Sequence, residues 1–295
     1  MEQKTIFALG FFDGVHLGHQ ALLAACRRMA EETGNTAGVV TFLGHPDTLV
    51  NGITPNLINT PADRVRLLRR FGMDTVVELA FDRALMTMSY LNFLRLLVTK
   101  YNAAGFVCGH DFRFGRYGDG NAHKLQTFCE AEGLLCTVVP EQKIGAVTIS
   151  STHIRSLLEL GDVVEAEKFL GHRHILTGTV VPGQRLGRTI GTPTANLVLP
   201  RGLLIPRFGV YICRAVVDGV SHPAVTNVGL RPTLGGTSIT VEPWLLDFEG
   251  DLYGQELTLE FFRFLHPERK FPSLVELQEE IQKNAEETRK FFEIQ

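Results

Sequence analysis

The hydrophobic and polar positions of this chain follow a different pattern in each half. Up to about residue 160, short apolar and β-prone runs alternate with longer runs whose apolar residues recur at helical spacing. The β-prone runs read AGVVTF, TVVELAF, AAGFVCG and LLCTVVP, and the helical runs read PADRVRLLRRFG, SYLNFLRLLVTKY and AHKLQTFCEAEG. Such alternation predicts an α/β unit built on a doubly wound parallel sheet.

The second half is predicted to be mostly β-structure. After about Gly171 the helical pattern disappears, glycines and prolines recur between short segments, and most of these segments are β-prone (ILTGTVV, GVYICRAVV, ELTLEFFRFL). This pattern predicts an antiparallel β-barrel or sandwich. One long amphipathic helix, over about residues 273–292, is expected to end the chain. Its apolar positions are Leu274, Leu277, Ile281 and Phe291. We place the boundary near Leu170, which gives domains 1–170 and 171–295.

The segment GFFDGVHLGH, from Gly10 to His19, lies where an apolar strand is followed by a helical pattern. Asp13 and Gly14 supply turn chemistry between the two elements. The free amides and the positive dipole end at the start of the following helix favour a bound phosphate. The segment therefore predicts a nucleotide triphosphate site at a strand–turn–helix junction.

Within this segment, His16 and His19 are spaced to share one face of the chain. Two imidazoles there could donate hydrogen bonds to α-phosphate oxygens as negative charge develops during a displacement, without a covalent intermediate or a catalytic base. Two other interpretations remain, a metal site and a pair of histidines on a helix surface. Zinc proteases, however, space such histidines four apart with a glutamate between them, and no cysteine or carboxylate lies at ligand spacing nearby.

A second segment, GHDFRFG, follows the apolar run AAGFVCG as a loop follows a strand. We single out Asp111 as its candidate nucleotide contact. Phe112 and Phe114 can be explained by packing on the core alone. At the carboxyl end of its strand, this loop is expected beside the histidine segment, where nucleotides bind in sheets of this kind.

A third segment, ISSTHIR, precedes an amphipathic run. Ser150, Ser151 and Thr152 can cap that helix, or can present hydroxyls and amides to a nucleotide. Arg155 would lie one turn into the helix, where a guanidinium can hold the β- and γ-phosphates bidentately and neutralise the leaving pyrophosphate.

Composition narrows the class of protein. The chain has 295 residues, of which 44% are hydrophobic and 21% are charged, which is typical of a globular protein large enough for two cores. The net charge of −3 argues against broad binding to nucleic acid or to a membrane surface. The local run RVRLLRR is interpreted as the solvated face of an amphipathic helix. Its arginines are Arg64, Arg66, Arg69 and Arg70.

The five cysteines are scattered and show no C-x-x-C spacing, which favours neither a disulfide framework nor a zinc ribbon. A reducing compartment is expected. The N-terminus does not resemble a signal peptide, and no stretch reaches membrane-spanning length. We therefore expect a cytoplasmic enzyme.

The second half carries a dense segment of its own, GTVVPGQRLGRTIGTPTANLVLP. Its glycines at four-residue spacing permit close backbone approach to phosphates, although a series of tight turns would explain them equally well. Thr194 and Asn196 offer hard oxygen ligands that suit Mg²⁺. The candidate nucleotide contacts of this loop are Gly183, Gly187 and Arg188.

These segments resemble those of known families. GFFDGVHLGH resembles the G-x-F-D-G-x-H-x-G-H signature of a nucleotidyltransferase superfamily, and the first three segments together resemble the FAD synthetase half of bacterial bifunctional riboflavin kinase/FAD synthetases. GTPTAN is similar to the G-x-P-T-A-N motif of riboflavin kinases, and GVYICRAVV, GLRPT and ERKF follow in that family's order. The resemblance covers nearly the whole chain. It implies a Rossmann-like nucleotidyltransferase domain followed by a riboflavin kinase barrel.

The resemblance also implies roles for single residues. Glu242 falls at the family's general base, which would accept the proton of the ribityl 5′-hydroxyl. Arg231 and Asp247 are the implied flavin contacts, whereas Trp244 is interpreted as a core residue rather than a flavin stacker. The implied nucleotide contacts in the first segment are Gly10, Phe11, Phe12, Asp13 and Gly14. Two departures from the family pattern, Gly44 before His45-Pro46 and Leu186 before Gly187, leave these candidate residues intact.

The implied activity is two successive reactions. Riboflavin and ATP would give FMN and ADP in the second domain, and FMN and ATP would then give FAD and pyrophosphate in the first. Mg²⁺ with ATP is the expected cofactor, without a tightly bound organic cofactor, and the protein is expected to be a monomer or weak oligomer that binds neither nucleic acid nor membrane. Three alternatives remain: retention of one activity only, transfer to another phosphate such as phosphopantetheine, and a regulatory protein that binds flavin without turnover.

Overall fold

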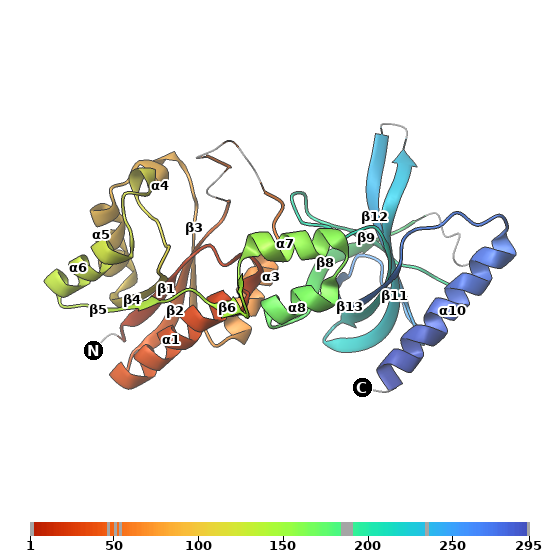
Figure 1. Ribbon diagram of the computed structural model, residues 1–295, viewed down its shortest axis with the longest axis horizontal. Coiled ribbons are helices and arrows are strands. Elements are labelled where there is room, and N and C mark those ends of the chain that lie inside the picture. The colour runs from red at the N-terminus through yellow and green to blue at the C-terminus, as the bar shows by residue number, and fades with distance from the viewer. Residues whose placement is uncertain are drawn as a thin grey trace. The chain divides into compact units, whose positions relative to one another are not determined.

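The computed structural model divides into two compact units, Met1–Ser151 and Thr152–Gln295 (Figure 1). This division assigns most of α7 (Ser151–Leu160) and all of α8 (Val163–Leu170) to the second unit, whereas the sequence placed both helices in the first domain. The domain boundary near Leu170 stays a prediction. The residues described are 3–45, 48–49, 52, 55–183, 191–233 and 236–293.

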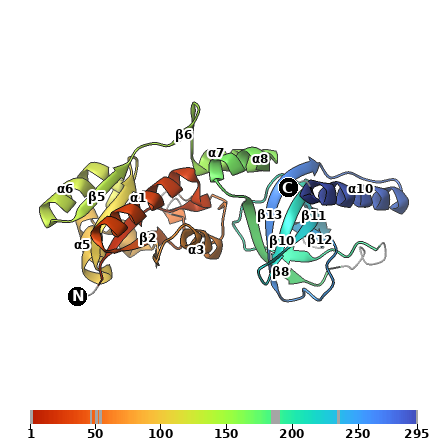
Figure 2. The ribbon, with the colours of Figure 1, turned by 90° about the horizontal axis from the view of Figure 1, so that it is seen from below.

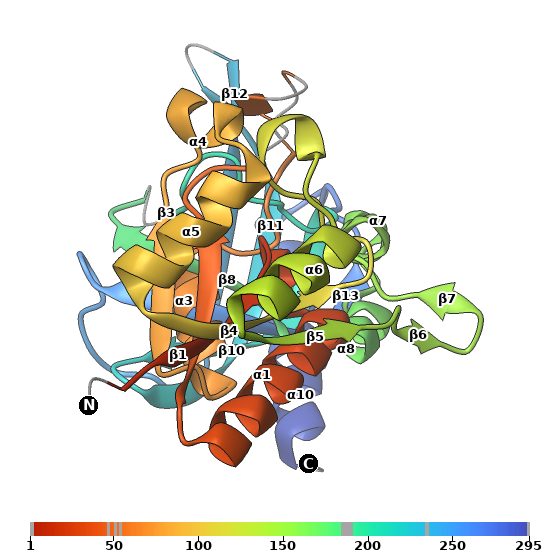
Figure 3. The same ribbon diagram turned by 90° about the vertical axis from the view of Figure 1, so that its left-hand side faces the viewer.

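The first unit is built on a parallel five-stranded sheet with the order β3-β2-β1-β4-β5, which confirms the predicted fold class. Helices cover both faces: α1 and α3 lie against one, and α5 and α6 against the other (Figures 2 and 3). The strands are β1 (Thr5–Leu9), β2 (Thr36–Phe42), β3 (Thr75–Leu79), β4 (Ala103–Gly109) and β5 (Leu135–Val139). The helices are α1 (Leu17–Thr33), α3 (Pro61–Arg70), α4 (Arg83–Thr87), α5 (Tyr90–Tyr101) and α6 (Ala122–Glu132), with 3-10 turns at Asp13–Val15 and Arg116–Gly118. A small hairpin completes the unit with β6 (Lys143–Ile144) and β7 (Val147–Thr148).

The core of the first unit lies between this sheet and its helices. β1 is buried along its whole length, because both of its faces are covered. Aromatic and aliphatic side chains of β1, β2 and β4 pack against α5 and α6, including Phe7, Phe93, Phe106 and Phe128. Since β1 and β4 are neighbours in the middle of the sheet, the loops after them meet at the point where strand order reverses.

Helix α3 corrects one interpretation from the sequence. Thr60 caps it by accepting a hydrogen bond from the Asp63 amide, and Pro61 occupies its first turn. Arg69 and Arg70 are exposed as predicted, but the prediction was wrong for Arg64, of which only 1% is exposed. Arg64 lies one turn before the buried Leu67 and Leu68, and this shared helix face, rather than the residue type, decides its burial.

The second unit is an antiparallel six-stranded sheet with the order β12-β11-β10-β13-β8-β9. The Ala195 amide of the segment before β9 donates to the Pro243 carbonyl of β12 at 2.8 Å, so the two edges meet and the sheet is a nearly closed barrel. The terminal helix α10 (Leu274–Glu293) confirms the predicted helix at the end of the chain. The strands are β8 (His174–Val181), β9 (Asn196–Val198), β10 (Gly209–Val217), β11 (Val220–Thr233), β12 (Gly236–Leu245) and β13 (Glu256–His266).

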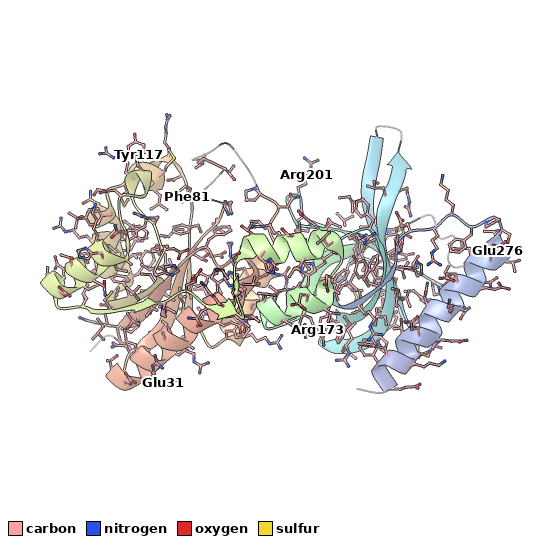
Figure 4. All side chains as sticks on the ribbon, viewed as in Figure 1. Glu31, Phe81, Tyr117, Arg173, Arg201 and Glu276 are labelled. Atoms are coloured by element: carbon pink, nitrogen blue, oxygen red, sulfur yellow. The ribbon has the colours of Figure 1, made fainter. Side chains whose placement is uncertain are left out.

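Aromatic rings and arginines hold the C-terminal end of α10 against the barrel. The Arg214 guanidinium lies 4.7 Å from the ring centre of Phe292 and 5.1 Å from that of Phe262. Arg173, labelled in Figure 4, lies 4.3 Å from the ring centre of Phe262 and pairs with Glu167. These contacts bury the apolar rings while the guanidinium groups reach solvent.

Two further observations concern the chain as a whole. No described helix combines the length and the apolar character needed to cross a bilayer. All five cysteines are free thiols, in agreement with the scattered spacing in the sequence.

Candidate active sites

The strand-to-helix turn of the first unit has a strained backbone. Phe12 (φ 61°), Gly14 (φ 80°) and Val15 (φ 40°) all have positive φ between the end of β1 and the start of α1. A β-branched residue at positive φ costs on the order of 1–3 kcal/mol and persists only where its surroundings hold it. The turn therefore needs contacts from outside itself.

Backbone amides and hydroxyl groups from three other segments supply those contacts. Asp13, which is 2% exposed, accepts hydrogen bonds through Oδ1 from the amides of Ile58 (2.9 Å) and Asn59 (3.4 Å). The Ser151 hydroxyl donates to the Asp13 carbonyl at 2.9 Å, and the Thr41 hydroxyl donates to the carbonyl of the preceding Phe11 at 2.9 Å. Ser151 of the third segment thus lies against the first segment.

The two histidines stack on one another at the start of α1. Their ring centres are 3.6 Å apart and their planes 14° apart. His16 caps the helix, with its Nδ1 accepting from the His19 amide at 3.3 Å. The neutral His16 ring therefore carries its proton on Nε2, which is a hydrogen-bond donor. Burial, His16 and Arg64 together hold the pKa of His19 well below its usual value.

Two glycines of the segment make room for this arrangement. A Cβ on Gly18 would lie 3.1 Å from the His16 ring, and one on Gly10 would lie 3.0 Å from the Phe12 ring. The Phe12 ring in turn packs on His19, with centres 5.1 Å apart. The spacing of glycine and histidine in the sequence is thus the spacing that a stacked pair of rings requires.

The second segment follows β4, beside the turn after β1. Phe114 is buried in the core, and Phe112 stacks on it with ring centres 5.4 Å apart, so both rings have the packing role that the sequence offered as an alternative. Asp111 is exposed, and its Oδ1 lies 3.0 Å from the position that a Cβ on Gly109 would occupy. Tyr117, in the loop that follows, is 94% exposed (Figure 4).

The remaining residues of the third segment lie at the start of α7. Ser150 is half-buried, Thr152 is exposed, and Arg155 is half-buried one turn into the helix. Ile154 and Leu158 form the buried face of α7. The nucleotide roles of Ser150, Thr152 and Arg155 stay predictions.

The second unit contains a largely apolar cavity of about 410 Å³ between the barrel and α10. Its size is within the range of small-molecule sites. Its walls come from the segment before β9, from β10 to β13, from the loop after β13 and from α10. The lining residues are Thr192, Thr194, Val210, Val225, Asn227, Glu242, Trp244, His266, Glu268, Arg269, Phe271, Leu274, Leu277, Glu280, Ile281 and Asn284.

Glu242 is the candidate base in the wall of this cavity. It pairs with Arg231 of the neighbouring strand β11, which lies four residues along that strand from Asn227, the residue in register with Glu242. Burial raises the pKa of Glu242; Arg231 opposes that rise and Glu268 adds to it. A half-buried carboxylate with a raised pKa is better suited to accept a proton than a solvated one.

Thr194 and Asn196 flank the start of β9. Thr194 lines the large cavity and also a second one of about 90 Å³, whose walls include Phe248 and Tyr253. A Cβ on Gly183 would overlap the Asn196 carboxamide, so the glycine leaves space for that side chain. Both side chains offer oxygen ligands of the kind that Mg²⁺ prefers. The described residues contain no group of three histidine, cysteine or acidic side chains that could hold a metal ion.

Some residues singled out in the sequence fall outside this geometry. Gly187, Arg188 and the departure at Leu186 lie outside the described residues. Asp247 forms an exposed ion pair with Arg289 of α10 (2.9 Å), and the described lining of the large cavity does not include it. A flavin contact for Asp247 stays a prediction that this geometry does not support.

The structure adds polar residues that the sequence did not single out. Asn284 Nδ2 lies 3.1 Å from His266 Nε2, and Glu280 Oε1 lies 3.2 Å from that nitrogen and 3.5 Å from Arg269 Nη1. One signal was present in the sequence: Asn284 follows Leu277 and Ile281 at helical spacing, so it is a polar residue at an apolar position. It is 4% exposed. Trp244, interpreted as core, packs on a small core cluster and also lines the cavity.

Comparisons with known proteins match both units. A family model described as FAD synthetase matches residues 1–153, and one described as riboflavin kinase matches residues 170–292. The chain is 33% identical to the bifunctional riboflavin kinase/FMN adenylyltransferase of Bacillus subtilis over 99% of this chain and 93% of that protein. It is 34% identical to the protein of the same name from Escherichia coli K12, over 99% of this chain and 94% of that protein.

A crystal structure titled as a macrolide-efflux protein from Streptococcus pneumoniae has a TM-score of 0.88 at 30% identity, covering 98% of this chain and 95% of that chain. Its title names a different activity from the names of the sequence relatives.

Proposed function

The chain belongs to the family of bifunctional riboflavin kinases/FMN adenylyltransferases, and we propose from this that it makes FMN in its second unit and FAD in its first. In the kinase reaction, the ribityl 5′-oxygen of riboflavin attacks the γ-phosphorus of ATP, and ADP leaves. In the adenylyl transfer, a phosphate oxygen of FMN attacks the α-phosphorus of ATP, and pyrophosphate leaves. The observation that carries the kinase assignment is the large cavity with the Glu242 carboxylate in its wall.

The lining of the cavity suits an isoalloxazine ring with a ribityl chain. Trp244, Leu277 and Ile281 supply the apolar surface that an aromatic ring system needs. The ribityl 5′-hydroxyl is assigned to the wall formed by Glu242, and the polar edge of the ring to Glu280 and Asn284. In this orientation the polar groups of the ligand meet polar groups of the protein, which avoids buried unpaired atoms.

Glu242 acts as the general base in this scheme. Its carboxylate accepts the 5′-hydroxyl proton as the oxygen attacks phosphorus. Arg231 orients the carboxylate through their ion pair, and Glu268 adds negative charge that favours proton uptake. The raised pKa brings the carboxylate closer to neutral pH, where a base combines availability with strength.

Thr194 and Asn196 are the residues that would hold Mg²⁺ with the ATP phosphates. Bound there, the ion would neutralise charge on the transferred phosphoryl group. Because Thr194 lines both cavities, it lies at the junction between the flavin cavity and the smaller one. The smaller cavity and the glycine segment around Gly183 are assigned to the nucleotide.

The histidine turn performs the adenylyl transfer. The Nε2 proton of His16 is a donor for an α-phosphate oxygen, and His19, kept uncharged by its surroundings, stacks behind it. Charge that develops on the phosphorus-bound oxygens is stabilised by these donors and by the helix N-terminus. Arg155 is assigned to the leaving pyrophosphate.

Chromatography of the flavins formed from riboflavin, ATP and Mg²⁺ tests this proposal. FMN and FAD should both appear, and their absence would reject it.

His16→Ala should abolish FAD while FMN accumulates. Glu242→Gln should abolish FMN formation, yet still convert supplied FMN to FAD. Loss of both activities in both variants would contradict the assignment of one reaction to each unit. FMN without FAD in the wild type would show a single retained activity, and flavin binding without ATP consumption would show a regulatory protein.

A further inference from the structure

Arg64 is a buried charge that the proposed chemistry does not use. It is 1% exposed, and it is the largest of the fully buried side chains. Burying a guanidinium removes its hydration and costs several kcal/mol unless its charge and its donors are matched. Leu67 and Leu68, one turn further along the same buried face of α3, are apolar.

The guanidinium contacts the residues at the ends of β1 and β2, where the histidine turn begins. Its Nη2 donates to the Phe42 carbonyl at the end of β2 at 2.6 Å. Its central carbon lies 4.5 Å from the ring centre of Phe11, the residue that leads from β1 into the turn. Nε and Nη1 have no hydrogen-bond partner among the described residues. The group thus holds two adjacent parallel strands together at their carboxyl ends, where the turn begins.

Two carboxylates act on the Arg64 charge, one from the turn and one from β3. Burial lowers the pKa of Arg64, and Asp13 of the turn and Glu78 of β3 oppose that shift by favouring its charged form. Asp13 is also the residue that receives the Ile58 and Asn59 amides and so fixes the turn. The positive charge of Arg64 acts in turn on His19, where it opposes protonation of the ring.

We propose that Arg64 is a positioning residue for adenylyl transfer: through its contact with the Phe11 ring and its hydrogen bond to the Phe42 carbonyl it holds the start of the strained turn, and so keeps the stacked His16 and His19 in register for the nucleotide. It acts through these groups and does not touch substrate. This inference rests on the proposed adenylyl transfer in the first unit.

The protonation of His19 provides a signature of this role. The titratable and charged groups that face His19 are His16 at the same helix start and Arg64 from α3, with Asp13 and Glu78 facing Arg64 in turn. Removing the Arg64 charge favours the imidazolium form of His19, so the pKa of His19 should rise. A charged imidazolium at position 19 disfavours the close stack with His16.

The test compares Arg64→Met, Arg64→Lys and the matched control Arg70→Met in the full chain. FAD formation from supplied FMN and ATP is measured together with FMN formation from riboflavin, which reports on the other unit of the same molecule. Arg64→Met should lower kcat for FAD formation about tenfold to a hundredfold, as expected for misplaced catalytic groups. FMN formation should stay within about twofold of wild type, and Arg70→Met should leave both reactions unchanged.

Arg64→Lys separates charge from geometry. Lysine keeps the positive charge but lacks the planar fork that reaches the Phe42 carbonyl and stacks on Phe11. It should therefore keep the His19 pKa low in a histidine NMR titration, with the signal assigned by its loss in His19→Gln, while kcat for FAD formation still falls. In Arg64→Met the same signal should titrate at higher pH.

Failure of the positioning role can be distinguished from failure of the proposed function. A wild-type protein that makes no FAD rejects the proposed function itself. If the wild type makes FAD, two results would overturn the positioning role. One is a folded Arg64→Lys variant with wild-type kcat for FAD formation. The other is an Arg64→Met variant in which the His19 signal titrates at the same pH as in the wild type. Unfolding of the first unit in both variants, seen as a lost thermal transition, assigns Arg64 to stability and also overturns it.

Discussion

The stack of His16 and His19 depends on the absence of a side chain at position 18. A Cβ there would lie 3.1 Å from the His16 ring, which is tight enough to displace it. Position 18 is otherwise an ordinary helical site near the start of α1, where alanine stabilises by about 0.5–1 kcal/mol relative to glycine. Gly18→Ala should therefore separate stability from activity.

We expect Gly18→Ala to lower kcat for FAD formation about tenfold, with an unchanged or higher melting temperature. FAD production from FMN and ATP, measured beside a thermal unfolding curve, checks this. FMN formation by the same protein is the internal control. FAD formation at the wild-type rate would show that the pair does not need its observed stacking.

If Glu242 is the base, as proposed, it should set the pH dependence of FMN formation. The carboxylate must be unprotonated to act as a base, so the rate falls as the pH decreases through its pKa. Burial raises that pKa, and the fall should therefore begin at a higher pH than an ordinary glutamate would give. Arg231→Met removes the cation that opposes the rise and should move the fall to still higher pH.

Profiles of kcat/KM for riboflavin against pH measure this shift. Arg231→Lys keeps a positive charge and should shift the profile less, while Arg201→Met, at an exposed position of the same unit (Figure 4), should leave it in place. An acid limb that moves to lower pH in Arg231→Met would contradict the role of Glu242 as the base.

Single residues show where sequence reasoning succeeded and where it could not. His16 and His19 share one face at the start of the helix, as their spacing predicted, because a strand-to-helix turn leaves little freedom for a short segment. Arg64 was misassigned, since a charged side chain in an amphipathic run is usually solvated and only the packed structure shows what faces it. Asp247 is engaged with Arg289, a pairing 42 positions apart that no local pattern contains.

At the scale of elements, α10 forms one wall of the large cavity that is proposed to bind flavin. Its apolar face was predicted from Leu274, Leu277 and Ile281, and these residues line the cavity. The pattern could not show what the face covers, because periodicity identifies an apolar stripe but not its partner. The same limit applies to β9, a strand of three residues whose closure of the barrel depends on long-range pairing with β8 and the edge of β12.

The polar contact between α10 and β13 leads to a prediction about substrate affinity. When the proton of the His266 ring is on Nδ1, which lies 2.8 Å from the Pro267 carbonyl oxygen, Nε2 accepts from Asn284 Nδ2 at 3.1 Å, beside Glu280 Oε1 at 3.2 Å. Asn284→Leu keeps the volume but removes this hydrogen bond and the proposed contact with the ring edge. A loss of about 1 kcal/mol corresponds to about a fivefold rise in KM for riboflavin.

Steady-state kinetics of FMN formation test Asn284→Leu, with Arg289→Met as the matched control on the same helix. Arg289 forms an exposed ion pair with Asp247, and pairs of this kind contribute little, so its KM should be unchanged. FAD formation from supplied FMN should be unaffected in both variants. Equal effects of the two substitutions would mean that α10 responds as a whole rather than through Asn284.

For the whole molecule, the arrangement of two units raises the question of how FMN reaches the adenylyl-transfer site. The candidate base and metal ligands, Glu242, Thr194 and Asn196, belong to the second unit, whereas His16 and His19 belong to the first. If FMN is released and rebound, the two reactions need not occur on one molecule. A mixture of full-length His16→Ala and Glu242→Gln, each lacking one reaction, should then make FAD from riboflavin and ATP after a lag in which free FMN accumulates. The lag should shorten as the concentration of His16→Ala is raised, because that protein supplies the intermediate. Wild-type protein at the same site concentrations should show the same lag. If the wild type forms FAD without a lag and the mixture forms no FAD, FMN is transferred directly within one chain.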